Sequence, residues 1–404
     1  MDQKTQANFL FAPLFVAFII TIALLGGCQG KSGHEQEEEK PETGVTGDGN
    51  LDDHLAYIVK RYDVPAIAAE IIENGDITEK AVSGVRCACG DKPVALGDHW
   101  HVGSITKSMT ATLAAVLVED GVMGYDTTIT QVFPEWTGHI NSEYENVRLD
   151  ELLSHTAGVS NDLENLPDWN DSFSDASPII SQRLKLSKSL LTIESESARG
   201  EFAYSNGGYV VAAAMMERLT GIDYETLLTQ KVFSPLQMNE TGFGAPDTGG
   251  AFNEPVGHEW TGSKWVGVDP ATGTIADNPP VLGPAGRVNT TLDDMAKYLS
   301  AHLAGAMGKG VPGFLTQESF DKLHSPLPNS SYALGWVVEN GVLIHDGSNT
   351  MWYAVAVIDP ALNQALFAAI NAADLEKNEK SRVIQAMQEA LTILKMRAEA
   401  NHSF

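Results

Sequence analysis

The sequence predicts an α/β protein of the α+β type, in which the two ends of the chain form one antiparallel sheet and the middle forms a helical lobe. Near the start, two apolar, β-prone runs at residues 66–72 and 77–85 flank Asn74-Gly75, a dipeptide typical of a tight hairpin turn. A comparable pattern returns near the end, where short apolar runs alternate with turn residues at 334–338, 342–345, 353–358 and 365–370. The simplest assembly pairs both ends in one sheet.

Helical periodicity appears in the middle of the chain and again at its end. One helix is predicted at residues 104–119, stopping at Gly121, and a second near Asn206, ending before Gly221. A third follows Thr291, which forms a capping-box pattern with Asp294. A last helix covers a face of the sheet with an apolar stripe formed by Val383, Ile384, Met387, Leu391 and Leu394.

Between these helices, residues 242–287 have the composition of a long loop, rich in Gly, Pro and Asn and containing Trp260 and Trp265. Loops of that length are often functional. The whole sequence of 404 residues, 43% of them apolar, is large enough for a substantial core.

The net negative charge of the chain disfavours one class of partner, the polyanions. The chain has 53 acidic residues against 26 Lys and Arg, a formal net charge of −27, which disfavours polyanions. We therefore expect no nucleic-acid partner.

The N-terminus has the pattern of an export signal. Residues 9–25 are almost continuously apolar behind Lys4, and the run ends in Leu25-Gly26-Gly27-Cys28, which looks like a bacterial lipobox. We predict a signal peptide at 1–28, lipidation at Cys28, a flexible acidic tether at 29–50 and a folded domain at 51–397. An uncleaved membrane anchor is the alternative. Either places the domain outside the cytoplasmic membrane, with the anchor as its one membrane contact.

Two further cysteines, Cys87 and Cys89, are too few for a disulfide framework. With His99 and His101 they could form a zinc site, but the spacing matches no common zinc pattern. For that reason we favour two small residues of an extended strand and predict neither a metal nor a cofactor. A disulfide between such near neighbours would be strained.

The strongest chemical candidate is Ser104-Ile105-Thr106-Lys107. A three-residue spacing is about one helical turn, so a helix starting at Ser104 holds its hydroxyl beside the Lys107 ammonium. A serine hydroxyl needs such a partner to become a nucleophile, and a helix start aims free N–H groups at developing negative charge. Alone, the pattern equally fits a helix cap beside a solvent-facing lysine.

Two other short stretches carry candidate groups. In Tyr204-Ser205-Asn206, a phenol with a lowered pKa could act as general base, and Asn206 could bind a substrate amide. In His345-Asp346-Gly347-Ser348, glycine would let a substrate lie along the strand, His345 would offer a donor to the pocket, and the Ser348 N–H could complete an oxyanion hole with that of Ser104. Taken singly, each stretch also fits an ordinary helix start or strand end.

In this order, the motifs resemble the serine β-lactamase and D,D-peptidase superfamily. Residues 102–107 are similar to its nucleophile helix, and residues 152–158, Leu-Leu-Ser-His-Thr-Ala-Gly, are similar to its Leu-Leu-x-His-Thr-Ser-Gly stretch. Residues 202–206 are similar to the Tyr-x-Asn element of its class C branch. The resemblance covers nearly all of the predicted domain.

The resemblance implies a β-lactamase/transpeptidase-like fold: an antiparallel sheet flanked by helices, beside an all-helical lobe, with the pocket between them. Its implied roles are Ser104 as nucleophile, Lys107 as its partner and Tyr204 as base. Asn206 would orient the substrate, together with the third element at His345, Gly347 and Ser348. His155 has no catalytic role that we can argue, and we expect a structural hydrogen bond from it.

One departure shapes the functional hypothesis. Class C β-lactamases carry Lys-Thr-Gly at the position where this chain has His345-Asp346-Gly347. The fixed cation of that lysine helps to bind a substrate carboxylate. In the family that this chain resembles, His-x-Gly occurs among D,D-peptidases, D-aminopeptidases and esterase-like members. The resemblance therefore implies an acyl-enzyme hydrolase of D,D-carboxypeptidase, D-aminopeptidase or esterase type, with a small-molecule or peptide substrate that contains an amide or ester bond. The alternatives are a true class C-like β-lactamase, a catalytically silent cell-wall binding protein and, more distantly, a metal-dependent hydrolase.

Overall fold

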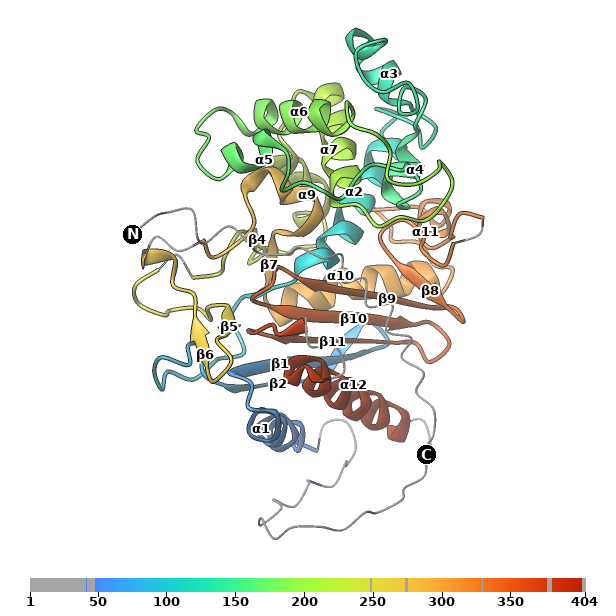
Figure 1. The fold of residues 1–404 in the computed structure, drawn as a ribbon. Helices are drawn as coiled ribbons and strands as arrows, with labels where there is room; N and C mark the ends of the chain where they lie inside the picture. Colours follow the sequence, from blue (N-terminus) through green and yellow to red (C-terminus); the bar gives the residue numbers. More distant parts are fainter. Residues whose placement is uncertain are drawn as a thin grey trace.

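A six-stranded antiparallel sheet forms the centre of the molecule (Figure 1). The computed structural model describes residues 41, 48–247, 249–272, 275–328, 330–375 and 380–401. The predicted signal peptide, Cys28 and most of the tether lie outside the described residues. In strand order the sheet consists of β2 (Asp76–Gly84), β1 (Ala66–Glu73), β11 (Gln364–Ile370), β10 (Tyr353–Asp359), β9 (Val342–Ser348) and β8 (Val337–Glu339).

Both Asn-Gly dipeptides form the predicted hairpin turns. Asn74 and Gly75 have φ angles of 57° and 88°, and Asn340 and Gly341 have 51° and 84°. This left-handed conformation at both central residues is what a two-residue hairpin requires. The run at 334–338 is a strand only from Val337, so the prediction was wrong for its first half.

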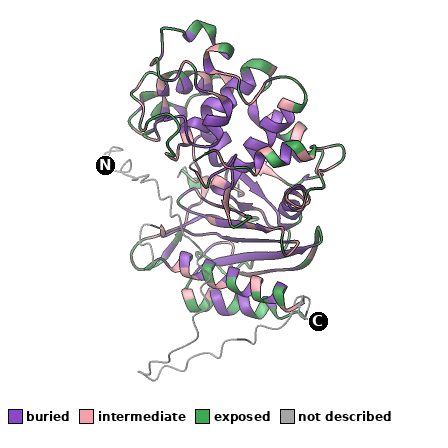
Figure 2. Ribbon diagram, turned by 90° about the vertical axis from the view of Figure 1, so that its right-hand side faces the viewer, coloured by how far each residue is buried: buried purple, intermediate pink, exposed green. Residues whose placement is uncertain are grey.

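Two helices cover one face of the sheet, as Figure 1 shows. The five apolar residues predicted for the last helix are all buried, which confirms that stripe. The outward sides of the same helices are exposed in Figure 2. These helices are α1 (Leu51–Tyr62) and α12 (Arg382–Asn401).

The other face packs against α10 and, beyond it, the helical lobe. At the start of α10, the Thr291 side chain accepts from the Asp294 N–H, as predicted. The Asp294 carboxylate does not complete the capping box with the Thr291 N–H; it accepts from Glu240 N and Thr241 Oγ1. The helices on this side are η2 (Gly103–Ile105), α2 (Thr106–Glu119), α3 (Ile129–Val132), η3 (Pro134–Trp136), α4 (Leu149–Leu153), α5 (Pro167–Ser172), α6 (Ile179–Leu190), α7 (Asn206–Thr220), α8 (Tyr224–Leu228), η4 (Thr229–Phe233), α10 (Leu292–Ala306) and α11 (Gln317–Leu323).

The segment 242–287 carries more structure than a loop. It contains a short hairpin and three short helical turns, so its description as a loop was incomplete. Strand β4 (Gly242–Phe243) pairs with β7 (Val288–Thr290), which also pairs with β3 (Trp100–His101). The other elements of the segment are β5 (His258–Trp260), β6 (Trp265–Gly267), η5 (Pro270–Thr272), η6 (Pro280–Leu282) and α9 (Gly283–Gly286).

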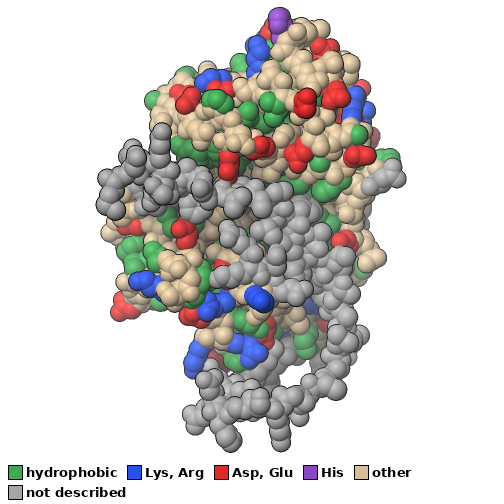
Figure 3. All heavy atoms as spheres, in the orientation of Figure 1, with side chains coloured by type: hydrophobic (Ala, Val, Ile, Leu, Met, Phe, Trp, Pro, Cys, Tyr) green, Lys and Arg blue, Asp and Glu red, His purple; other side chains and the backbone are tan. Residues whose placement is uncertain are grey.

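Together these elements confirm the predicted fold class, an antiparallel sheet joined to a helical lobe. On the face shown in Figure 3, acidic side chains are spread over the helical lobe among uncharged, Lys and Arg side chains. Among the described residues, we find no helix with both the length and the apolar character needed to cross a bilayer.

Candidate active site

The nucleophile candidate Ser104 lies in η2, the short turn that leads into α2, where it is partly exposed. Strand β9 packs directly against this turn. A Cβ atom at Gly347 would collide with the Val102 carbonyl and the Ser104 amide, and one at Gly103 (φ 52°) would collide with the Ser348 amide. Only glycine permits this close approach of the two backbones, which carry the predicted oxyanion amides of Ser104 and Ser348.

Lys107 is fully buried one turn after Ser104. Its Nζ lies 2.9 Å from Ser104 Oγ, 2.7 Å from Asn206 Oδ1 and 2.6 Å from the Ala285 carbonyl. Burial holds the pKa of Lys107 well below its usual value, against a smaller opposing effect of Asp346. A neutral amine suits these three contacts, because two N–H groups can donate to Asn206 and Ala285 while the lone pair accepts from Ser104.

Tyr204 lies on the other side of the nucleophile. Its hydroxyl hydrogen-bonds with the Ser104 side chain, and its ring centroid is 4.8 Å from Lys107 Nζ. Burial raises the pKa of Tyr204, and the nearby charge of Asp346 raises it further. The predicted lowering of this pKa was therefore wrong, because the effect of burial outweighs the hydrogen bond from Ser104. A protonated Tyr204 can donate a proton or relay one.

Asn206 is the first residue of α7, which Ser205 caps by accepting from the Gly208 N–H at 3.0 Å. The backbone N–H of Asn206 donates to Asn161 Oδ1 at 2.9 Å, so a residue that sequence reasoning did not single out helps to orient it. The signal in the sequence that could have indicated Asn161 is its position three residues after the 152–158 stretch.

His155 supplies the predicted structural hydrogen bond. Its Nδ1 accepts from the Ser205 N–H at 3.0 Å, and its carbonyl accepts from the Ala203 N–H at 2.8 Å. The ring lies 4.2 Å from the Tyr204 ring and 4.6 Å from the Tyr332 ring, measured between centroids. His155 thereby fixes the segment that carries Tyr204.

The third motif differs from its prediction at His345. The ring is buried, and its Nε2 lies 2.9 Å from the Tyr332 hydroxyl, so it does not offer a free donor to the pocket. Burial lowers the pKa of His345 to about 3, and repulsion from Lys107 contributes. His345 is therefore neutral at physiological pH and supplies no cation.

Asp346, the next residue, is partly exposed and accepts a 3.3 Å hydrogen bond from the Tyr353 hydroxyl. Burial raises the pKa of Asp346 to about 6, although the phenol hydrogen bond and Lys107 oppose the rise. Above that pH it places a negative charge within electrostatic reach of both Lys107 and Tyr204.

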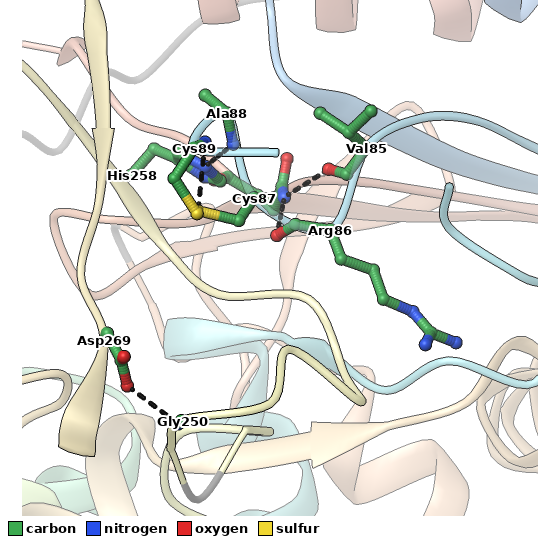
Figure 4. The surroundings of a disulfide bond; sticks show 9 residues. Val85, Arg86, Cys87, Ala88, Cys89, Gly250, His258 and Asp269 are labelled. Carbon is green, nitrogen blue, oxygen red and sulfur yellow. Dashed lines mark hydrogen bonds between the residues drawn. A yellow bond between two sulfur atoms is a disulfide. The ribbon is translucent and has the colours of Figure 1, made fainter. Parts of the chain in front are cut away.

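The four residues of the zinc hypothesis have separate partners. Cys87 and Cys89 form a disulfide with each other beside His258 (Figure 4), which corrects the prediction of two unpaired strand residues. His99 pairs with Glu254 at 3.1 Å and His101 with Asp277 at 3.1 Å. Within the described ranges, no three His, Cys, Asp or Glu side chains cluster as metal ligands would.

Known proteins are similar to this chain over most of its length. The Beta-lactamase family model matches residues 51–390. Penicillin-binding protein 4 of Amycolatopsis lactamdurans is 27% identical over 247 residues, 60% of this chain and 60% of that protein. The chain thus spans less than two thirds of that relative's length.

Solved structures share the fold. D-amino acid amidase from Ochrobactrum anthropi SV3, complexed with L-phenylalanine amide, superposes with a TM-score of 0.68 at 22% identity, covering 86% of this chain and 98% of that one. EstCE1, described as a hydrolase with promiscuous acyltransferase activity, gives a TM-score of 0.67 at 17% identity, covering 85% and 97%. The extent of the family match, together with the site geometry, shows that the chain belongs to the beta-lactamase family.

Proposed function

We propose that the protein is a serine hydrolase that forms a covalent acyl-enzyme at Ser104 with an amide or ester substrate. One observation carries the proposal: the Ser104 hydroxyl contacts both the Lys107 amine and the Tyr204 phenol. A nucleophile between a neutral amine and a proton donor is the arrangement that acyl transfer needs.

Acylation begins with proton transfer from Ser104 Oγ to Lys107 Nζ as Oγ forms a bond to the substrate carbonyl carbon. The carbonyl π electrons move to its oxygen, and the amides of Ser104 and Ser348 donate to that oxyanion. Burial favours a neutral Lys107 before the transfer, and Asp346 stabilises the ammonium formed by it.

Collapse of the tetrahedral intermediate breaks the bond to the leaving nitrogen or oxygen. Tyr204 donates its proton to that atom and regains one from Lys107, which restores the neutral amine. Water then attacks the acyl-enzyme by the reverse sequence, releasing the acid and returning the proton to Ser104 Oγ. No group other than these side chains and water is needed to balance the protons.

The charge pattern of the pocket favours substrates with a free amino group over substrates with a carboxylate. Neutral His345 and ionised Asp346 occupy the strand wall, where a carboxylate would need a cation. D-amino acid amides fit this pattern, and the fold likeness to a D-amino acid amidase agrees with it. A true β-lactamase and a D,D-carboxypeptidase are the less favoured alternatives, because their substrates carry a carboxylate.

The test is a panel of a D-amino acid amide, a short-chain ester, a D-Ala-D-Ala peptide and a β-lactam. We expect turnover of the amide and the ester, and a loss on the order of 10⁴-fold or more in Ser104→Ala. Ser108→Ala is the matched control, since Ser108 lies one turn along the same helix and donates to the Ile105 carbonyl at 2.8 Å. Full activity of Ser104→Ala, or binding without turnover of any compound, would contradict the proposal.

We also propose that the protein is exported and lipid-anchored through Cys28, with the domain facing the periplasm or the exterior. The support is the apolar run ending in Leu-Gly-Gly-Cys. Mass spectrometry of the membrane fraction should find an N-terminal peptide that begins with diacylated Cys28. The same peptide should be absent from the Cys28→Ser variant. A full-length N-terminus in both proteins would favour the uncleaved anchor.

A further inference from the structure

A buried carboxylate, Asp277, contacts His101, which precedes the nucleophile turn, and Asn349, which follows Ser348. It belongs to the segment between β6 and η6, and its residue is 9% exposed. Oδ1 accepts from Asn349 Nδ2 at 2.9 Å and from the Asn278 N–H at 2.8 Å, and lies 3.1 Å from His101 Nε2. Oδ2 accepts from Arg287 Nε at 3.3 Å.

Two chains of contacts, called branches here, start at Asp277. The first branch connects Asp277 to the nucleophile turn through His101. The Gly103 N–H donates to His101 Nδ1 at 3.1 Å, so this nitrogen carries no proton. A neutral ring must then carry its proton on Nε2, which lies 3.1 Å from Asp277 Oδ1 in an ion-pair-type contact, not in an aligned hydrogen bond. Because Gly103 directly precedes Ser104, the tautomer of His101 affects the direction of the Ser104 amide.

The second branch leads to strand β9 through Asn349, which directly follows Ser348 and is buried. Its Nδ2 donates to Asp277 while its Oδ1 accepts from the Met351 N–H at 3.2 Å. Ser348 Oγ accepts from the Thr350 N–H at 2.9 Å, which closes the same turn. The conformation after Ser348 therefore depends on the same carboxylate as the conformation before Ser104.

We propose that Asp277 is a positioning residue that aligns the two oxyanion N–H groups, those of Ser104 and Ser348, through His101 and Asn349. The inference rests on the proposed acyl-enzyme function. Asp277 contacts no reacting atom in this account, and its effect passes through the two side chains that it orients. The function given above assigns no role to Asp277, His101 or Asn349.

The charge state of Asp277 is consistent with this role. Burial would raise its pKa, but the His101 ring, Arg287 and Asn349 together outweigh burial and hold the pKa of Asp277 below its usual range. The carboxylate is thus ionised at neutral pH and can only accept hydrogen bonds. An amide in its place would present donors as well, and could turn His101 to the tautomer whose Nδ1–H opposes the Gly103 N–H.

A purely structural carboxylate and a positioning carboxylate predict different results. Loss of a structural group lowers stability and leaves the rate per folded molecule unchanged. Loss of alignment lowers the rate of steps that build charge on the oxyanion, while substrate binding changes little. The two can be separated by measuring the reaction rate per folded molecule.

The experiment measures the rate constant for Ser104 modification by a fluorophosphonate, together with kcat and KM for an ester, in wild type and Asp277→Asn. We expect a 10- to 100-fold fall in the modification rate and in kcat, with KM within about threefold. Asp247→Asn is the matched control: Asp247 is 6% exposed, lies between β4 and β5, and accepts from the Gly249 and Glu254 N–H groups. It should lower the thermal midpoint without lowering the rate per folded molecule.

Asn349→Ala removes one branch alone and is the second variant, should Asp277→Asn not fold. It should lower the modification rate in the same direction by a smaller factor. Equal rates per folded molecule in wild type and Asp277→Asn, or in wild type and Asn349→Ala where that variant is needed, would overturn the inference. Failure of the wild type to react at Ser104 would overturn the proposed function instead, so the two failures are distinguishable.

Discussion

The two walls of the active site handle charge in opposite ways. On the helical wall, Lys107 is buried, has three hydrogen-bond partners, and burial holds its pKa well below the usual value. On the strand wall, Asp346 is partly exposed, bonds the Tyr353 hydroxyl and stays ionised above a pKa of about 6. The comparison indicates that the helical wall supplies proton transfer, while the strand wall determines which substrate charge is accepted.

Removing the amine of the helical wall should have the larger effect. Lys107→Met keeps the length of the side chain but not the base, so we expect kcat to fall by about 10² to 10⁴-fold. Lys107→Arg should not restore activity, because a guanidinium stays charged. In the wild type, kcat/KM should rise with pH through the lowered pKa of Lys107, since the deprotonated amine is the active form.

The control for this prediction is Lys231→Met, which removes an exposed lysine paired with Asp120 at 2.8 Å. Surface pairs of this kind contribute little to stability, so its activity should match that of the wild type. Activity of Lys107→Met within a few-fold of wild type would mean that the base is another group. The assignment of proton transfer to the helical wall would then be wrong.

Removing the charge of the strand wall should have a smaller and more selective effect. In Asp346→Asn at pH 8, we expect kcat/KM for a D-amino acid amide to fall by about tenfold, the loss of one partly screened ion pair. The N-acetylated amide is the control substrate. Its kcat/KM should fall by a smaller factor, because it has no ammonium and retains only the effect of Asp346 on Lys107. The wild-type preference for the free amine should fade as pH drops below about 6, where Asp346 becomes protonated.

Stability gives an independent measurement for the same variant. The folded-state pKa of Asp346 is raised above its ordinary value of 3.8, so folding is less favourable where this group is ionised. Asp346→Asn should therefore raise the thermal midpoint at pH 8 and change it little at pH 4. Equal loss of activity on the free and acetylated amides would show that Asp346 shapes the site without binding an amine.

Sequence reasoning predicted the helical wall better than the strand wall for a physical reason. Ser104 and Lys107 lie one helical turn apart, and Tyr204 and Asn206 flank a helix cap, so local geometry nearly fixes each pair. The Asn-Gly hairpins were predictable for the same reason, since the turn type depends on two residues.

The missed features depend on packing between distant segments. The direction of the Tyr204 pKa shift follows from its burial beneath two lobes, and the bond from His345 to Tyr332 follows from how β9 meets the lobe. The contact between His101 and Asp277 joins residues 176 positions apart in the chain, given by 277 − 101. The sequence showed His101 two residues before Gly103, but nothing in it indicated which carboxylate would face the ring.

The most direct test of the central claim is to isolate the covalent intermediate. After incubation with a fluorophosphonate or a slowly hydrolysed activated ester, peptide mapping should place one adduct on Ser104, at a rate that rises with pH as Lys107 loses its proton. An adduct on any other residue, or a rate independent of pH and unchanged in Lys107→Met, would contradict the assignment of Ser104 as a nucleophile activated by a neutral lysine.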